Sequence, residues 1–364
     1  MTESMRDLAL QEIDVQPSPS PASGGLSAGL SGGSSSVAAD VRLTPVASAM
    51  ALVAEDLVLV EAQLGELLRS TFAIIPRIGG HLTFAGGKRF RPMVTLLAAQ
   101  AAGFDGDDRI TVAAAGELLH TATLLHDDVI DEGEFRRGRP AARMRYGNGL
   151  AVLTGDYCYA RALQAVAYLG EPRAIQTMAD AVTRMAEGEV AQLHVAGECD
   201  FDRERYYMVI DRKTAALISW CSAVAELVEP RYAAALARYG REVGYAFQIA
   251  DDIIDYSLDV EDSGKARGQD LREGKATLPL IFACERRPEL RERIEALFRA
   301  GPPVDEDELF GVLEAVIEVG GLDAARAQAE DHVDAAVEAL AALPPSPARA
   351  ALEDLARYIV GRTA

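Results

Sequence analysis

The chain is poor in positive charge, and that shortage excludes whole classes of partner. Among its 364 residues, 36 are Lys or Arg and 56 are Asp or Glu, which gives a formal net charge of −20. We expect no nucleic-acid partner, because phosphate backbones are held by extended basic patches. Adhesion to anionic lipid through bulk charge is equally disfavoured. Any anionic ligand must therefore be held by a local cluster of cations that overcomes the global field.

Cysteine and long apolar runs are scarce as well. The four cysteines are widely separated and form no CxxC pair. This spacing fits no metal site and favours buried thiols in a reducing compartment. No apolar run reaches the roughly 18 to 20 residues of a membrane-spanning helix. The first residues, MTESMRDLALQEID, carry acids and lack an apolar centre, unlike a secretory signal. We therefore expect a cytoplasmic protein with no membrane span.

What is abundant is Ala and Leu, whereas alternating Val, Ile and Thr are scarce, which indicates an all-α fold. Residues 16–39 are low-complexity Pro, Ser, Gly and Ala, which cannot bury enough apolar surface to fold. We predict a disordered leader over 1–45 and one all-helical domain over 46–364. Gly and Pro clusters, Gly79-Gly80 among them, are expected to separate the helices. Helices are predicted near 46–72, 89–102, 109–131, 149–168, 172–195, 203–228, 231–258, 276–298, 306–318, 322–341 and 346–361.

One acidic pattern occurs twice, each time at the end of an apolar helical run. Its aspartates, at i, i+1 and i+4, are Asp127, Asp128 and Asp131 in HDDVID and Asp251, Asp252 and Asp255 in ADDIID. A single copy could be a solvated acidic face, but two copies indicate carboxylates that converge inside a helical bundle. Such carboxylates repel one another unless cations neutralise them, and oxygen-only ligands favour Mg²⁺, or Mn²⁺, over zinc. Because Mg²⁺ usually completes its shell with phosphate oxygens, a phosphorylated substrate is predicted.

Cations gather beside glycine turns and beside these aspartates. GGKRFRP, residues 86–92, opens a glycine turn onto three cations, and Arg136 and Arg137 closely follow the first aspartate cluster. Further cations come later in the chain at Lys213, Lys265 and Lys275. Arginine binds phosphate oxygens in pairs, and lysine acts as a point charge. Two basic groups together with two metal-binding clusters predict that two diphosphates are held side by side.

The ordered set of motifs resembles the trans-prenyltransferase family, the polyprenyl diphosphate synthases of long-chain type, over about residues 46 to 362. The matching motifs are GGKRFRP, ELLHTATLLHDDVIDEGEFRRG, GDY, EGEVAQL, DRKTA, FQIADDIIDY and GKARGQDLREGKATLPLI. The resemblance implies a large single-domain helical bundle of the isoprenoid synthase type around a deep central cavity, usually found as a homodimer. One departure is Arg143, which stands where many relatives carry Asn and puts a local packing contact in doubt.

The resemblance also implies the reaction. An allylic diphosphate ionises, the double bond of isopentenyl diphosphate attacks the resulting cation head-to-tail (1′-4), and a proton is lost. Such a prenyltransferase of isoprenoid biosynthesis depends on Mg²⁺, or on Mn²⁺ in its place. It must stabilise the departing diphosphate and shield a carbocation from water.

By the same resemblance, each candidate residue receives a role. The metal ligands would be the six aspartates, Asp127, Asp128, Asp131, Asp251, Asp252 and Asp255. The allylic diphosphate would be bound by Arg136, Lys213, Lys265 and Lys275. The isopentenyl diphosphate would be bound by Lys88, Arg91, His120 and Arg137. Thr214 and Gln248 would lie beside the carbocation as dipoles and join Lys213 and the aspartates in the catalytic set. His126 is interpreted as a hydrogen-bonded core residue.

Product length can be predicted from the residues that precede Asp127. Thr123 and Ala122, four and five residues earlier, lie one helical turn deeper, where an aromatic side chain would block a growing product. Their small side chains predict an all-trans product of about C30 to C50, such as a quinone side-chain precursor, because a tunnel without a plug accepts more condensations. So lipophilic a product is compatible with transient membrane association.

Three alternatives stay open at this point. A shorter-chain farnesyl or geranylgeranyl diphosphate synthase would share every motif. A non-catalytic regulatory subunit of a heteromeric synthase is disfavoured, because every expected aspartate and cation is present. A di-iron carboxylate protein is suggested by the ExxH of Glu117 and His120, but it requires a second ExxH that the chain lacks.

Overall fold

The structure, a computed structural model, describes residues 44–85, 88–195, 200–223, 230–257, 267–300 and 304–363. Over these ranges it is helical apart from one antiparallel hairpin of β1 (Phe135–Arg136) and β2 (Arg139–Pro140). The predicted all-α class is therefore confirmed. The predicted leader lies almost entirely outside the described residues. No helix in the described ranges combines the length and the apolar character needed to cross a membrane.

The first half of the domain contains α2 (Pro45–Leu52), α3 (Ala54–Leu68), α4 (Ile74–Thr83), α5 (Phe90–Ala101), α6 (Asp108–Ile130), α7 (Ala142–Tyr146), α8 (Asn148–Ala167) and α9 (Pro172–Val195). The second half contains α10 (Arg203–Ile210), the π-helix η1 (Asp211–Ala215), α11 (Ala216–Ser222), α12 (Pro230–Ser257), α14 (Gln269–Arg272), α15 (Leu278–Arg286), α16 (Glu289–Ala300), α17 (Glu306–Glu318), α18 (Gly321–Ala339), the 3₁₀ turn η3 (Leu340–Ala342) and α19 (Pro347–Gly361).

Several helix boundaries follow from local chemistry that the sequence shows. Asp305 accepts hydrogen bonds from two backbone N–H groups of the first turn of α17, and Ser346 accepts one at the start of α19. The helices predicted near 172–195 and 306–318 are found as α9 and α17. The helix predicted near 276–298 was wrong as one element, because the chain turns at Arg287 and forms α15 and α16.

The expected break at Gly79-Gly80 was also wrong, since both glycines lie inside α4. The physical reason is a close packing contact rather than a turn. A Cβ atom on Gly79 would lie 2.5 Å from Cδ2 of Leu68, so the absence of a side chain lets α4 approach α3. Glycine here permits helix–helix contact.

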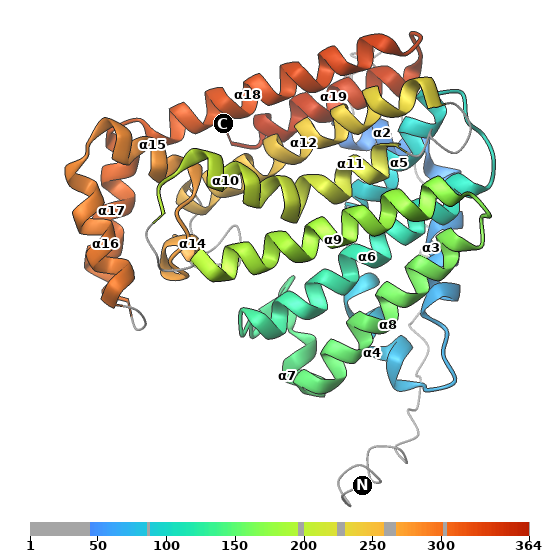
Figure 1. The fold of residues 1–364 in the computed structure, drawn as a ribbon, viewed down its shortest axis with the longest axis horizontal. Helices are drawn as coiled ribbons and strands as arrows, with labels where there is room; N and C mark the ends of the chain where they lie inside the picture. The colour runs from blue at the N-terminus through green and yellow to red at the C-terminus, as the bar shows by residue number, and fades with distance from the viewer. Residues whose placement is uncertain are drawn as a thin grey trace, which may run out of the picture. The chain divides into compact units, whose positions relative to one another are not determined.

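Two long helices organise the fold. α6 packs against α3, α5 and α8, while α12 packs against α11, α18 and α19 (Figure 1). Their apolar side chains belong to one large buried core. A smaller core joins the end of α12 to the segments from α14 to α17, and Figure 1 shows α16 and α17 as an orange hairpin at one end. The two predicted aspartate clusters therefore lie at the carboxyl ends of the two central helices, α6 and α12.

Candidate active site

The first aspartate cluster lies where α6 ends, and Asp128 is its buried member. The side chain is 1% exposed, its Oδ1 accepts a hydrogen bond of 2.8 Å from Nε of Arg136 on β1, and Nη2 of the same arginine forms an ion pair of 2.8 Å with that oxygen. Its Oδ2 is buried and has no hydrogen-bond partner within the described part of the chain. An unsatisfied buried carboxylate oxygen is costly, so this atom is suited to contact with a cation.

Asp127 and Asp131 face cations that come from other elements. Burial raises the pKa of Asp127 to about 6, and the nearby Lys213 of η1 opposes that shift. Burial also raises the pKa of Asp131, where Lys275 and Lys213 oppose it. The structure thus brings the first cluster together with two of the cations predicted to bind the allylic diphosphate.

The three aspartates of the second cluster lie in different environments, and Asp252 is the buried member. It is 3% exposed and accepts hydrogen bonds from the Tyr206 hydroxyl at 2.6 Å and from Nε2 of Gln248 at 2.9 Å. Burial, with the neighbouring charge of Asp270, raises the pKa of Asp252 well above its ordinary value. Asp270 was not predicted as a site residue, although it lies within the GQDLREGK motif.

The other two aspartates of this cluster have partners outside the cluster. Both oxygens of Asp255 accept backbone N–H groups, from Gln269 at 3.0 Å and Asp270 at 3.1 Å, at the start of α14. Asp251 is exposed and forms an ion pair of 3.2 Å with Arg362, just beyond α19. Their predicted metal-binding role stays a prediction.

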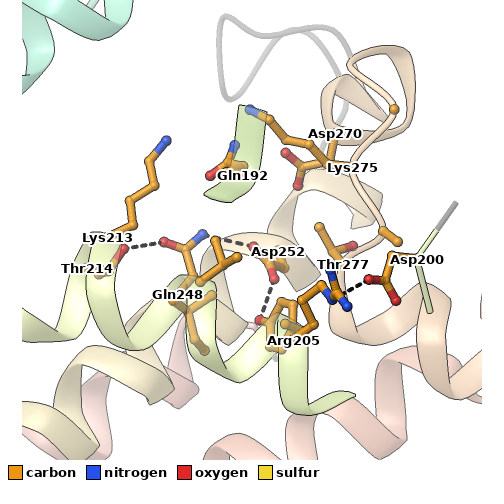
Figure 2. A pocket seen from close by; sticks show the side chains of 15 residues that line it. Gln192, Asp200, Arg205, Lys213, Thr214, Gln248, Asp252, Asp270, Lys275 and Thr277 are labelled. Carbon is orange, nitrogen blue, oxygen red and sulfur yellow. Dashed lines mark hydrogen bonds and ion pairs between the residues drawn. The ribbon is translucent and has the colours of Figure 1, made fainter. Parts of the chain in front are cut away.

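A pocket between α9, η1, α12 and the segment around Lys275 contains the chemically active side chains (Figure 2). Thr214 donates a hydrogen bond of 2.9 Å to Oε1 of Gln248, whose amide in turn donates to Asp252. Figure 2 shows Lys213 and Lys275 on opposite sides of Gln192, with Asp252 below Gln192 in the view. Thr214 and Gln248 therefore form a fixed chain of dipoles, and their role beside a carbocation stays a prediction.

Lys213 and Thr214 are carried by an irregular helix turn. η1 is a π-helix over Asp211–Ala215, an insertion that often occurs at functional sites. The Nζ atom of Lys213 lies 2.7 Å from a carboxylate oxygen of Glu189 on α9. Sequence reasoning gave no sign of this π-helix, because its residues fit an ordinary helical pattern.

A second pocket adjoins α5, α6, α12 and α19, and it gathers the four residues predicted to bind isopentenyl diphosphate. Lys88, Arg91, His120 and Arg137 all line it. The Nε atom of Arg91 is buried and has no hydrogen-bond partner among the described residues. Burial, together with Arg91 and two further arginines, lowers the pKa of His120 well below its usual value, which favours the uncharged imidazole. The pocket also contains Arg362, which was not predicted.

Several other predicted residues can now be placed. Ala122 is fully buried in the core, and Thr123 donates a hydrogen bond of 2.8 Å to the carbonyl of His120. His126 bonds the carbonyl of Val152 at 3.1 Å, which agrees with its interpretation as a hydrogen-bonded residue. Lys265 lies outside the described residues.

Arg143, the departure from the family pattern, holds the loop that follows the first aspartate cluster. Its guanidinium donates hydrogen bonds to the carbonyl oxygens of Gly133 at 2.9 Å and Glu132 at 2.5 Å. In this chain, the arginine therefore makes its own packing contacts at that position. Glu132 has a φ angle of +52°, so the loop it belongs to turns sharply.

The described residues contain no group of three or more His, Cys, Asp or Glu side chains arranged to hold a metal ion unaided. The two clusters lie on different helices, and the charges of Lys213 and Lys275 act on Asp131 of the first cluster. A metal ion at either cluster would therefore need further oxygen ligands, which phosphate groups supply for Mg²⁺.

Comparison with known proteins agrees with this geometry. The family model Polyprenyl synthetase matches residues 73–316. Octaprenyl diphosphate synthase of Escherichia coli is 42% identical over 315 residues, which cover 85% of this chain and 97% of that protein. A nonaprenyl diphosphate synthase of Rhodobacter capsulatus, described as all-trans and specific for geranyl diphosphate, is 37% identical over 86% of this chain and 97% of that protein.

Solved structures give the same result. A polyprenyl synthase from Caulobacter crescentus, complexed with calcium and isoprenyl diphosphate, has a TM-score of 0.83 and 39% identity, and the match covers 88% of this chain and 98% of that one. A decaprenyl diphosphate synthase from Rhodobacter capsulatus also has a TM-score of 0.83 and 39% identity, over 88% of this chain and all of that one. The chain belongs to the polyprenyl synthetase family.

Proposed function

We propose that this chain is a long-chain all-trans polyprenyl diphosphate synthase, a prenyltransferase that adds isopentenyl diphosphate units to an allylic diphosphate. One observation carries the proposal: Asp252 of the second cluster lines a pocket with Lys213 and Lys275, whose charges also act on the first cluster, and a second pocket gathers Lys88, Arg91 and Arg137. The first pocket suits the allylic diphosphate and the second suits isopentenyl diphosphate. The relatives' names support the reaction and its long product.

The aspartates fit a divalent metal ion of the Mg²⁺ or Mn²⁺ type. Their donors are all carboxylate oxygens, and the buried Oδ2 of Asp128 has no other partner in the described ranges. The ligands would be Asp127, Asp128 and Asp131 on one side and Asp251, Asp252 and Asp255 on the other. When bound, the metal supplies positive charge that stabilises the departing diphosphate. The calcium in the Caulobacter relative supports a divalent ion.

Cations of this chain would bind the two diphosphates. Lys213 and Lys275 enter the first pocket from opposite sides and would hold the allylic diphosphate, with Arg136 and Lys265 as further cations. Lys88, Arg91 and Arg137 would bind isopentenyl diphosphate, and His120 would act as a hydrogen-bond partner. Since both Arg136 and Arg137 come from one short segment, a single turn contributes a cation toward each substrate.

Thr214 and Gln248 would stabilise the allylic cation. Their oxygen atoms belong to a hydrogen-bonded chain that ends on Asp252, so the dipoles are oriented before any charge develops. The reaction requires no nucleophile from the protein. The departing diphosphate itself serves as the acceptor of the proton lost after condensation.

The chain-length proposal rests on Ala122 and Thr123. Ala122 is fully buried and Thr123 is partly buried, one turn before Asp127. Neither side chain is bulky enough to close a tunnel at that depth. We expect a product of about C30 to C50, because no bulky side chain at these two positions blocks the growing chain.

One assay tests the function and the product length together. The purified protein is incubated with Mg²⁺, labelled isopentenyl diphosphate and farnesyl or geranylgeranyl diphosphate, and product lengths are measured. We expect Mg²⁺-dependent incorporation into long products, and shorter products from Ala122→Phe. Absence of incorporation with every primer would refute catalysis and favour a regulatory subunit. Unchanged lengths in a folded Ala122→Phe variant would refute the tunnel proposal.

We further propose that the enzyme is a cytoplasmic homodimer. The family resemblance supports a homodimer, and the acidic, cysteine-poor composition supports a reducing cytoplasmic environment. Light scattering coupled to size-exclusion chromatography measures the assembly directly. A mass equal to one chain would contradict the dimer.

A further inference from the structure

Of the three cations in GGKRFRP, the middle one lines the second pocket, but its guanidinium is bound to groups of the protein. Arg89 makes four hydrogen bonds: to Oε1 and Oε2 of Glu61, to Oε1 of Glu117 at 3.1 Å, and to the carbonyl of Thr83 at 2.8 Å. Its side chain is 10% exposed. Since a guanidinium has five N–H donors, Arg89 has little capacity left to bind a diphosphate.

The two neighbouring cations differ from Arg89 in this respect. Lys88 is exposed, and its Nζ atom lies 5.8 Å from the ring centre of Tyr358 in the second pocket. Arg91 lines the same pocket and keeps a buried Nε without a hydrogen-bond partner in the described chain. A buried, unsatisfied donor beside a pocket is suited to an anionic ligand.

The backbone of Arg89 explains how these neighbours come to face one pocket. Arg89 has φ +48° and ψ +40°, the left-handed conformation that L-residues seldom adopt, and it immediately precedes α5. Such a conformation persists only where surrounding contacts hold it. The ion pairs to Glu61 on α3 and Glu117 on α6 provide that hold, and they tie the turn to two helices.

Glu117 has a second effect on the pocket. It is 5% exposed and is the acidic residue among the described residues that line the pocket, where five cations gather. Burial lowers the pKa of Arg91 and of Arg137, and Glu117 is the foremost charge that opposes this shift for both. The negative charge of this glutamate therefore offsets part of the repulsion among the cations before any diphosphate is bound.

We propose that Arg89 and Glu117, with Glu61, are positioning residues of the isopentenyl diphosphate site: their ion pairs hold the left-handed turn that presents Lys88 and Arg91. The inference rests on the proposed function of that pocket. It also gives the ExxH glutamate a role unrelated to iron. Arg89 itself does not bind the diphosphate.

The direction in which one KM value changes distinguishes a positioning role from direct binding of the diphosphate. If Arg89 were a diphosphate ligand restrained by acids, Glu117→Gln would release it and lower the KM for isopentenyl diphosphate. If Glu117 positions the turn, the same change raises that KM by about tenfold, the effect of losing roughly one hydrogen bond to a charged group. The KM for the allylic diphosphate should change by less than about twofold, because the first pocket lies apart from this turn.

Backbone rescue gives a second readout. Arg89→Gly should retain a lower KM for isopentenyl diphosphate than Arg89→Ala, because glycine adopts positive φ without strain. The matched control is Asp56→Asn, which breaks a buried ion pair to Arg109 of 2.7 Å that also joins α3 to α6. This control should lower stability while leaving both KM values unchanged.

The outcomes are distinguishable from failure of the proposed function. A wild-type protein that incorporates no isopentenyl diphosphate overturns the proposed function. An active wild type whose Glu117→Gln variant has an unchanged or lowered KM overturns the positioning role alone. If Glu117→Gln fails to fold, Glu61→Gln replaces it, because the Glu61 side chain is 40% exposed. We expect Glu61→Gln to raise the same KM, and an unchanged value overturns the proposal as well.

Discussion

Neighbouring carboxylates within one motif behave differently because their surroundings differ. Asp128 is paired with Arg136 through one oxygen, whereas burial raises the pKa of Asp127 to about 6. Its ordinary value is 3.8, so the folded protein binds this proton more tightly than the unfolded chain does. The resulting stabilisation is fully present below about pH 4 and is lost as the pH rises through about 6.

This shift predicts a pH-dependent effect of Asp127→Asn on the metal-free protein. The variant removes the cost of an ionised buried carboxylate, so its unfolding free energy relative to wild type should increase as the pH rises from 4 to 7. Denaturant melts at several pH values in EDTA measure the difference. Asp180→Asn, at an exposed position on α9, is the control and should show no such trend. A flat difference for Asp127→Asn would contradict the raised pKa.

Individual site residues were predictable where a local sequence motif specifies their chemistry. Lys88, Arg91, His120 and Arg137 were assigned by resemblance, and the structure gathers them around one pocket. Arg362 was missed, because its approach to that pocket depends on the packing of α19, far along the chain. Local sequence also gave no means of telling Arg89 from Arg91, since their difference lies in partners on α3 and α6.

At the scale of elements, helix existence was easier to predict than helix irregularity. Apolar periodicity identified α9 and α17. The sequence did not predict that η1 is a π-helix, nor that α4 continues through its two glycines. η1 depends on two close contacts: a Cβ on Gly188 would lie 2.7 Å from the backbone N of Lys213, and one on Gly244 would lie 2.6 Å from Cα of Ala215.

These contacts predict that Gly188→Ala damages catalysis. The added methyl group meets backbone and Cβ atoms of η1, which must shift, and Lys213 and Thr214 shift with it. Because misplacement of catalytic groups near 1 Å costs about 100-fold, we expect kcat/KM for the allylic substrate to fall ~10- to 100-fold. The KM for isopentenyl diphosphate should change much less.

Gly65→Ala on α3 is the matched control, since a Cβ there meets nothing within 4 Å. It should leave the kinetics unchanged and stabilise the helix by up to about 1 kcal/mol. Normal kinetics for Gly188→Ala would show that η1 tolerates displacement.

At the scale of the whole molecule, repulsion between like charges in the active site lowers the stability of the ligand-free fold. The net charge is −20, yet the site collects aspartates at the ends of α6 and α12 and cations around a second pocket. Like charges within each group repel, and metal ions with diphosphate relieve both repulsions at once. Ligand binding should therefore stabilise the entire fold, because α6 and α12 are packed into one core.

The last prediction concerns thermal stability. At 100 times the dissociation constant, a ligand that binds only the folded state adds about 2.7 kcal/mol, which raises the Tm of a domain of this size by about 4 °C. We expect Mg²⁺ with inorganic diphosphate to raise Tm by that amount in a thermal-shift assay, and either component alone to raise it less. Asp127→Ala with Asp252→Ala should abolish the joint effect. Equal shifts in that double variant and wild type would mean that the stabilisation arises outside the aspartate clusters.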